Sequence, residues 1–103
     1  MKVYITISGM CYHHGSNFIE AQMIGKLKLQ LVKEPDNKYD QEAIMVKVPG
    51  IGKVGYVANS VKTVCEDCYS AGRLYDKIGD TAECVVEFKL DSNTVVASVE
   101  VDA

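Results

Sequence analysis

The sequence predicts a mainly β domain, of the all-β class, with five or six short strands and one or two short helices. Several segments alternate apolar and polar residues, which is the pattern of half-buried strands. Glycine, proline and asparagine separate these segments at short intervals, as in antiparallel sheets joined by turns. The 103 residues contain no internal repeat and no linker, so we expect one domain over residues 1–103. Closure into a small barrel would remove exposed edges, although alternation alone does not choose a barrel over a sandwich.

The alternation assigns the elements in order. The expected strands are residues 3–8, 26–33, 43–48, 53–57, 81–90 and 94–101. Residues 17–24 fit a short helix or a strand equally well, and residues 70–80 are expected to form a loop with one helical turn. Asn59 or Ser60 can cap a second helix that continues to about Cys68.

The loop in residues 34–44, EPDNKYDQEAI, is longer and more polar than a reversal of direction requires. A hairpin turn needs only about two to five residues. One interpretation is a well-capped loop whose Tyr39 folds onto the core. The other is a pocket in which Tyr39 offers an aromatic face and Asn37 and Asp40 offer hydrogen-bonding groups. Such a set suits a nucleobase stacked on the ring and a sugar hydroxyl held by a carboxylate.

Composition and charge narrow the function. The net charge of −3 and the pI of about 5.3 argue against strong nonspecific affinity for long nucleic acid. No run of about 18 apolar residues is present, so no membrane span is expected. The first residues alternate as a strand rather than forming a secretion signal, which makes the cytoplasm the expected compartment and reduced thiols the expected state of the cysteines. Arg73, the only arginine, is expected to contact an anion or to pair with Asp76 or Asp80.

The stretch KLKLQLVKEPDNKYDQEAIMVKVPGIGKVGYVANSV resembles the central signature of the HIRAN domain family. That signature has a strand, an acid-Pro-x-Asn-x-Tyr-Asp loop, an Ala-Ile strand, a glycine turn and a Val-Gly-aromatic strand. The upstream residues 9–12, GMCY, resemble the family's first turn, so the resemblance covers about residues 5–62. From residue 70 onward the chain resembles only small, stand-alone bacterial members.

The resemblance implies a modified, OB-like β-barrel that binds nucleic acid without catalysis. In the fork-remodelling helicases of eukaryotes this domain grips the free 3′ end of single-stranded DNA. The implied role is therefore an accessory one in DNA repair or replication, with a helicase or nuclease as the expected protein partner. Carried over by position, Tyr12 and Tyr39 stack the terminal bases. Asn37 and Asp40 face the terminal sugar, and Asp40 accepts a hydrogen bond from the 3′-hydroxyl.

Three departures from the DNA-gripping version weaken the expected phosphate clamp. Tyr56 and Asn59 lie at positions where the DNA-gripping version contacts backbone phosphates with a histidine and a lysine. Cys11 lies at the position where that version has an arginine. Each charge-assisted bond that is lost is worth roughly 1.5–3 kcal/mol. Lys33 and Lys38 are expected to restore part of the charge.

A Cys-x-x-Cys spacing at Cys65 and Cys68 raises the question of zinc. Two further ligands would complete a tetrahedral site. The candidates elsewhere in the chain are Cys11, His13, His14 and Cys84. A strong zinc signature has a second closely spaced pair, which this chain lacks, and packing against an apolar face accounts for the two cysteines. We therefore expect no metal and no cofactor.

Two other functions compete with the nucleic-acid module. A protein-interaction or regulatory module that kept the fold but lost strong DNA binding would fit the acidic charge. An enzyme that cleaves phosphodiesters would use clustered carboxylates to hold metal ions. Asp36, Asp40 and Glu42 are close in sequence, but no second cluster accompanies them, so we expect no catalysis.

Overall fold

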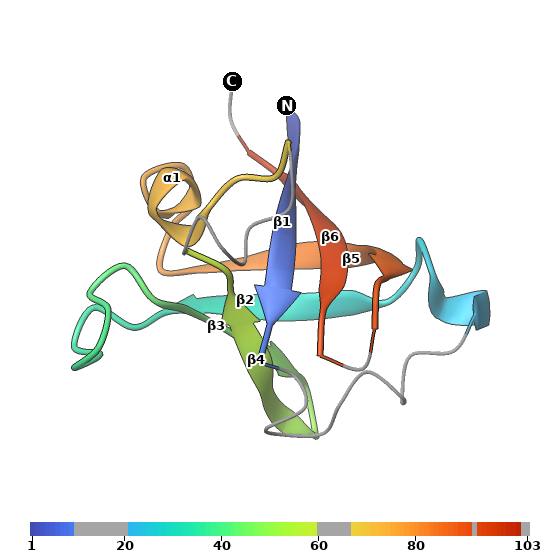
Figure 1. The fold of residues 1–103 in the computed structure, drawn as a ribbon, viewed down its shortest axis with the longest axis horizontal. Coiled ribbons are helices and arrows are strands. Elements are labelled where there is room, and N and C mark those ends of the chain that lie inside the picture. The colour runs from blue at the N-terminus through green and yellow to red at the C-terminus, as the bar shows by residue number, and fades with distance from the viewer. Residues whose placement is uncertain (10–20, 60–66, 92, 102–103) are drawn as a thin grey trace.

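The computed structural model describes residues 1–9, 21–59, 67–91 and 93–101. Six antiparallel strands close into a barrel in the order β1-β4-β3-β2-β5-β6 (Figure 1). The strands are β1 (Lys2–Ser8), β2 (Lys28–Lys33), β3 (Ile44–Val48), β4 (Gly52–Val57), β5 (Thr81–Lys89) and β6 (Val95–Glu100). A 3-10 turn, η2 (Ala21–Met23), precedes β2, and a short helix, α1 (Ala71–Tyr75), precedes β5. The predicted fold class is confirmed, and the strands form a barrel rather than a sandwich.

The core fills the barrel interior with the apolar residues of the alternating strands. Val3, Ile5 and Ile7 of β1 point inward, while Lys2 and Tyr4 are exposed. Leu29 and Leu31 repeat this pattern in β2. Each large apolar side chain buried in this way contributes about 1.5–3 kcal/mol to folding, so the period-two pattern is the main sequence signal for the barrel.

The β5–β6 hairpin forms as predicted, with a β-bulge between Val86 and Phe88. A bulge inserts one extra residue and changes the direction of the side chains that follow it. Val86 is fully buried, whereas Phe88 and Leu90 are each about half exposed. The end of β5 therefore presents apolar side chains outside the barrel.

The helices differ in part from the expectation. The helical turn expected within residues 70–80 is α1, whose first turn is capped by Ser70: its Oγ accepts a hydrogen bond from the Arg73 amide at 3.2 Å. The helix predicted from Asn59 or Ser60 does not reach Cys68, because Asp67 has a φ of +67° and Cys68 is not helical. Residues 60–66 lie outside the described part of the chain.

The barrel closes through a short seam between β1 and β4. Only Ile7 with Val57 and Ser8 with Tyr56 are paired there, whereas β1 and β6 pair from Lys2–Glu100 to Ile7–Val95. Beyond the two pairs, the Ala58 amide donates to the Thr6 carbonyl at 2.7 Å. The seam ends beside the β2–β3 loop, and this is where the candidate site lies. In the described residues, no helix is long and apolar enough to cross a membrane.

Candidate functional site

A pocket of about 400 Å³ lies where β4 ends and the β2–β3 loop begins to return. Its walls combine small apolar side chains with two aromatic rings and polar groups. The lining residues are Ser8, Asn37, Tyr39, Asp40, Ala43, Tyr56, Val57, Ala58 and Asn59. Pockets that bind small ligands are commonly apolar with a few well-placed polar groups, and this pocket has that character.

Tyr39 stands out of the β2–β3 loop at the edge of the pocket. Its side chain is 97% exposed, so the interpretation in which it folds onto the core is wrong. An aromatic ring left in water forgoes the packing that usually stabilises it. The ring therefore adds nothing to the core and is available to a ligand on its face.

Asn37 holds the loop in shape. Its Oδ1 accepts hydrogen bonds from the amides of Tyr39 and Asp40, at 2.8 and 3.1 Å. Its Nδ2 donates to Glu34 Oε1 at 3.0 Å. An asparagine that bonds the backbone two and three residues later is a common way to fix a turn. Asn37 thus sets the position of Tyr39 above the pocket.

The Asp40 carboxylate is fixed from two sides. Its Oδ1 accepts the Glu42 amide at 2.8 Å, and its Oδ2 accepts Asn59 Nδ2 at 2.9 Å. Asn59 in turn accepts the Gly72 amide on its Oδ1 at 2.8 Å. This chain of hydrogen bonds ties the loop to the end of β4 and to α1, and it places the carboxylate on the wall of the pocket.

Tyr56 is engaged at its hydroxyl, which donates to Glu34 Oε1 at 2.7 Å and accepts from Lys53 Nζ at 3.0 Å. The hydrogen bond to Tyr56 raises the pKa of Lys53. Sequence reasoning missed both Glu34 and Lys53. Residues three apart on a strand are expected on opposite faces, so the alternation of β4 gave no signal for a contact between Lys53 and Tyr56.

The structure brings five of the six predicted site residues to one pocket. Asn37, Tyr39, Asp40, Tyr56 and Asn59 all line it. The sixth, Tyr12, lies outside the described residues, as do the neighbouring Cys11, His13 and His14. The contribution of Tyr12 to the pocket stays a prediction.

The remaining cysteines are placed only in part. Cys84 lies in the barrel core, 1% exposed, and burial raises the pKa of its thiol to about 12. Cys68 is half-buried, and Cys65 lies outside the described residues. Within the described part of the chain, no group of three or more histidine, cysteine or acidic side chains is arranged to hold a metal ion.

Comparison with known proteins defines the family. The model of the HIRAN domain matches residues 1–102. The chain belongs to the HIRAN domain family. The crystal structure of the HIRAN domain of human HLTF matches with a TM-score of 0.65 at 20% identity, covering 97% of this chain and 74% of that chain. At this identity the likeness shows the fold. No match is found among curated proteins. HIRAN domains are nucleic-acid-binding modules rather than catalytic ones.

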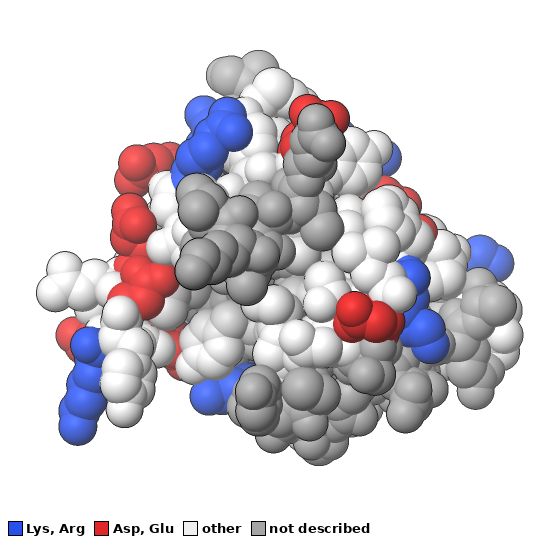
Figure 2. All heavy atoms as spheres, viewed as in Figure 1, with Lys and Arg blue, Asp and Glu red and all other residues white. Residues whose placement is uncertain are grey.

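The surroundings of the pocket in this HIRAN domain are acidic. Glu34, Asp36, Asp40 and Glu42 belong to the same loop. Figure 2 shows acidic side chains gathered at the left of the molecule, where Figure 1 shows the β2–β3 loop and α1. Lys33 does not line this pocket; its Nζ donates to the Ile78 carbonyl at 2.8 Å and lies 4.3 Å from the Tyr75 ring centroid. That Lys33 and Lys38 supply charge to a ligand stays a prediction.

Arg73 also has a structural contact of a different kind from the expected one. Its guanidinium carbon lies 4.0 Å from the centroid of the Tyr69 ring, which is a cation–π geometry. Neither Asp76 nor Asp80 forms an ion pair with Arg73 in the described structure. In the described residues Arg73 thus packs α1 against the residue that precedes its cap instead of forming the predicted ion pair, and its contact with a bound anion stays a prediction.

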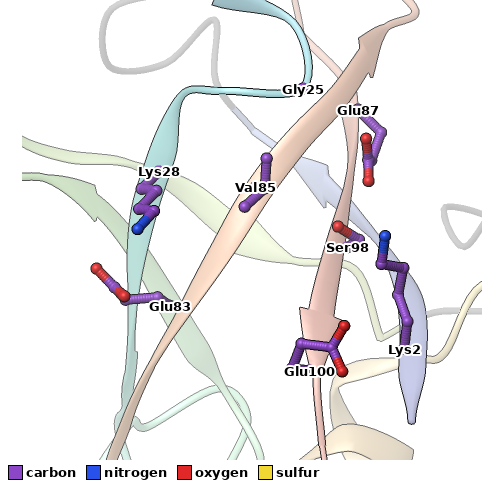
Figure 3. A pocket seen from close by; sticks show the side chains of 8 residues that line it. All are labelled: Lys2, Gly25, Lys28, Glu83, Val85, Glu87, Ser98 and Glu100. Carbon is purple, nitrogen blue, oxygen red and sulfur yellow. The ribbon is translucent and has the colours of Figure 1, made fainter.

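A second pocket of the HIRAN domain, of about 380 Å³, lies on the outside of the barrel (Figure 3). Charges of both signs line it. Its lining residues come from four adjacent strands and from Gly25, which lies between η2 and β2. Its lining consists of Lys2, Gly25, Lys28, Glu83, Val85, Glu87, Ser98 and Glu100. None of these described residues is aromatic, so this pocket offers no face for a base. The Tyr39 pocket is the better candidate for the family's activity.

Proposed function

We propose that this HIRAN domain binds the 3′ end of single-stranded DNA without catalysing a reaction on it. The terminal base stacks on Tyr39, and the terminal 3′-hydroxyl donates a hydrogen bond to Asp40. The single observation that carries the proposal is the fully exposed Tyr39 ring beside an apolar pocket whose wall holds a fixed carboxylate. Tyr12 adds a second stacking surface in this proposal. The domain acts as an accessory in DNA repair or replication, beside a helicase or nuclease.

The energetics favour an end over the interior of a strand. Stacking of a base on an aromatic side chain is worth about 1–3 kcal/mol and does not depend on sequence. Phosphates approaching the pocket meet the carboxylates of Asp40 and Glu42, so an internal phosphodiester is repelled. A terminal hydroxyl instead finds an acceptor in Asp40. The site therefore takes its binding energy from the last nucleotide.

The direct test compares otherwise identical strands with different 3′ groups. Short 5′-labelled single strands ending in a 3′-hydroxyl or a 3′-phosphate are titrated with the domain, and binding is followed by fluorescence anisotropy. We expect the hydroxyl end to bind more tightly, because a phosphate removes the donor and adds charge beside Asp40. Equal affinity for the two ends, or no binding of either, would contradict the proposal.

Tyr39→Ala should weaken binding of the 3′-hydroxyl strand about 5- to 100-fold, as expected for the loss of one stacked base. Tyr39→Phe keeps the ring and should keep the affinity. The melting temperature should change little in either variant, because the side chain is 97% exposed. Tyr4→Ala is the matched control, since Tyr4 is also an exposed tyrosine but lies on β1 and does not line the pocket. A Tyr39→Ala variant with unchanged affinity would remove the stacking role.

A protein-interaction module is the second candidate, and the end of β5 favours it. Phe88 and Leu90 are each about half exposed after the bulge. Exposed apolar side chains that are close together can mark a protein contact. In this case a purified partner would be released by the double variant Phe88→Ser, Leu90→Ser but not by Tyr39→Ala. The opposite pattern would assign the contact to the pocket.

A further inference from the structure

We propose that the Tyr39 pocket prefers a strand whose last nucleotide is a ribonucleotide over one that ends in deoxyribose. The inference rests on the proposed function and specifies the sugar that the pocket selects. It follows from counting the hydrogen-bond acceptors that the side chains of Asn37, Asn59 and Asp40 still offer once their own contacts are made.

Asn37 has no acceptor left for a sugar. A carbonyl oxygen has two lone pairs, and Asn37 Oδ1 accepts both the Tyr39 and the Asp40 amides. Asn37 is therefore a positioning residue for the loop, not an acceptor for a hydroxyl. Asn59 directs its Oδ1 to the Gly72 amide and its Nδ2 to Asp40, so it too serves the scaffold.

Asp40 keeps one acceptor position on each of its two oxygens. An ionised carboxylate has about four lone-pair sites. The structure gives Oδ1 one donor, the Glu42 amide, and Oδ2 one donor, Asn59 Nδ2. Because one donor belongs to the β2–β3 loop and the other follows the end of β4, rotation of the carboxylate would break at least one of these bonds. It presents two adjacent acceptors in a fixed plane on the pocket wall.

A terminal ribose matches these two acceptors. Its 2′- and 3′-hydroxyls lie on neighbouring carbons on the same side of the ring, so both can donate to one carboxylate. Deoxyribose has only the 3′-hydroxyl to donate. Hydrogen bonds to an ionised acceptor are roughly twice as strong as neutral ones, so the second bond has a measurable effect. The 2′-hydroxyl is the group by which a protein distinguishes RNA from DNA at one site.

The test uses DNA strands of one sequence that differ only in the last sugar. The four ends are deoxyribose, ribose, 2′-O-methylribose and 3′-deoxyribose, with anisotropy titrations as in the test of the 3′ group. A single terminal change leaves the rest of the backbone the same. The 2′-O-methyl end keeps the substituent but removes its proton, so it separates hydrogen bonding from the pucker of the sugar.

We expect the ribose end to bind about tenfold more tightly than the deoxyribose end, as for one added bond to a charged group. The 2′-O-methyl end should lose this gain. In Asp40→Asn the ratio of ribose to deoxyribose affinity should fall to about one, because an amide in this position keeps at most one acceptor atom. Asp36→Asn is the matched control: it removes one charge from the same loop but does not line the pocket, so the ratio should persist.

Three results would overturn the inference. They are equal affinity for ribose and deoxyribose ends, a 2′-O-methyl end as tight as ribose, or an unchanged ratio in Asp40→Asn. If ribose and deoxyribose ends bind equally well and the 3′-phosphate end does not bind, the inference fails but the proposed function stands. Absence of binding by every strand would instead refute the proposed function, and with it this inference.

Discussion

Tyr39 and Cys84 show the two extremes of how single side chains are used in this barrel. Tyr39 is almost wholly in water, so the fold gains nothing from its ring. Cys84 is almost wholly in the core and packs there as a small apolar residue. From the sequence alone, both residues are candidates for a functional site. Burial separates them, because only the exposed one can reach a ligand.

Cys84 leads to a pH prediction. Burial raises the pKa of its thiol from 9.0 to about 12, so the unfolded chain ionises at lower pH than the folded one. The unfolded state then binds fewer protons, and the free energy of unfolding falls as pH rises from 9 towards 12. In Cys84→Val this fall should be shallower. Urea denaturation at about pH 7, 9 and 10.5 measures it, because these values lie below, at and above the pKa of 9.0 of the unfolded thiol and all lie below the folded value of about 12. Parallel pH profiles for the two proteins would show that the thiol does not titrate in this way.

At the level of elements, the β3–β4 hairpin depends on its glycines. Gly50 and Gly52 have φ values of +87° and +103°. Ile51 lies between them, and its amide donates a hydrogen bond to the Val48 carbonyl at 3.0 Å. Residues with a Cβ atom rarely adopt such angles. The hairpin carries Lys53 and Tyr56, so the turn also sets the far wall of the pocket.

Gly52→Ala should lower the free energy of unfolding by about 1–2 kcal/mol, because alanine is strained at this φ. Gly79→Ala is the control: Gly79 has no positive φ, and an added Cβ would meet nothing closer than the Thr81 carbonyl at 3.9 Å. That variant should be neutral or slightly stabilising. Thermal and urea unfolding measure both changes, and a Gly52→Ala variant as stable as Gly79→Ala would show that the hairpin relaxes.

The elements also show what could be predicted from the sequence. The strands were predictable, because Leu29 and Leu31 alternate with polar residues and only a strand buries that pattern. It was not predictable that the helix expected from Asn59 or Ser60 would fail to reach Cys68. Asp67 adopts a left-handed conformation, which aspartate tolerates but which no sequence pattern predicts. Of the site, the loop residues were found through their motif. The link from Glu34 through Tyr56 to Lys53 joins separate segments, so it needed the fold.

At the scale of the whole molecule, charge limits how a strand can be held. The net charge is −3, and the Nζ of Lys33 donates to the Ile78 carbonyl and lies over the Tyr75 ring. Lys38, Lys53 and Lys62 are the lysines nearest to the pocket residues in sequence. A domain with this distribution neutralises few phosphates, so its binding should depend only weakly on salt.

The affinity for a single strand with a 3′-hydroxyl should therefore fall only slowly with ionic strength. For one to three phosphate contacts, log K against log salt should have a slope of about −0.7 to −2. Anisotropy titrations across a range of NaCl concentrations give the slope. A value of about −4 or steeper would mean that a cationic surface, and not the last nucleotide, supplies most of the binding.

The pairing of β1 with β6 has a consequence for how the barrel responds to force. Lys2 pairs with Glu100 at one end of this ladder and Ile7 with Val95 at the other, and Figure 1 shows the start of β1 and the end of β6 at the same end of the molecule. Tension applied through residues 1 and 101 would load the Lys2–Glu100 pair first and then each following pair in succession. Antiparallel strands pulled in this direction peel apart at low force, so a tethered copy should yield readily in a stretching experiment even where its thermal stability is ordinary.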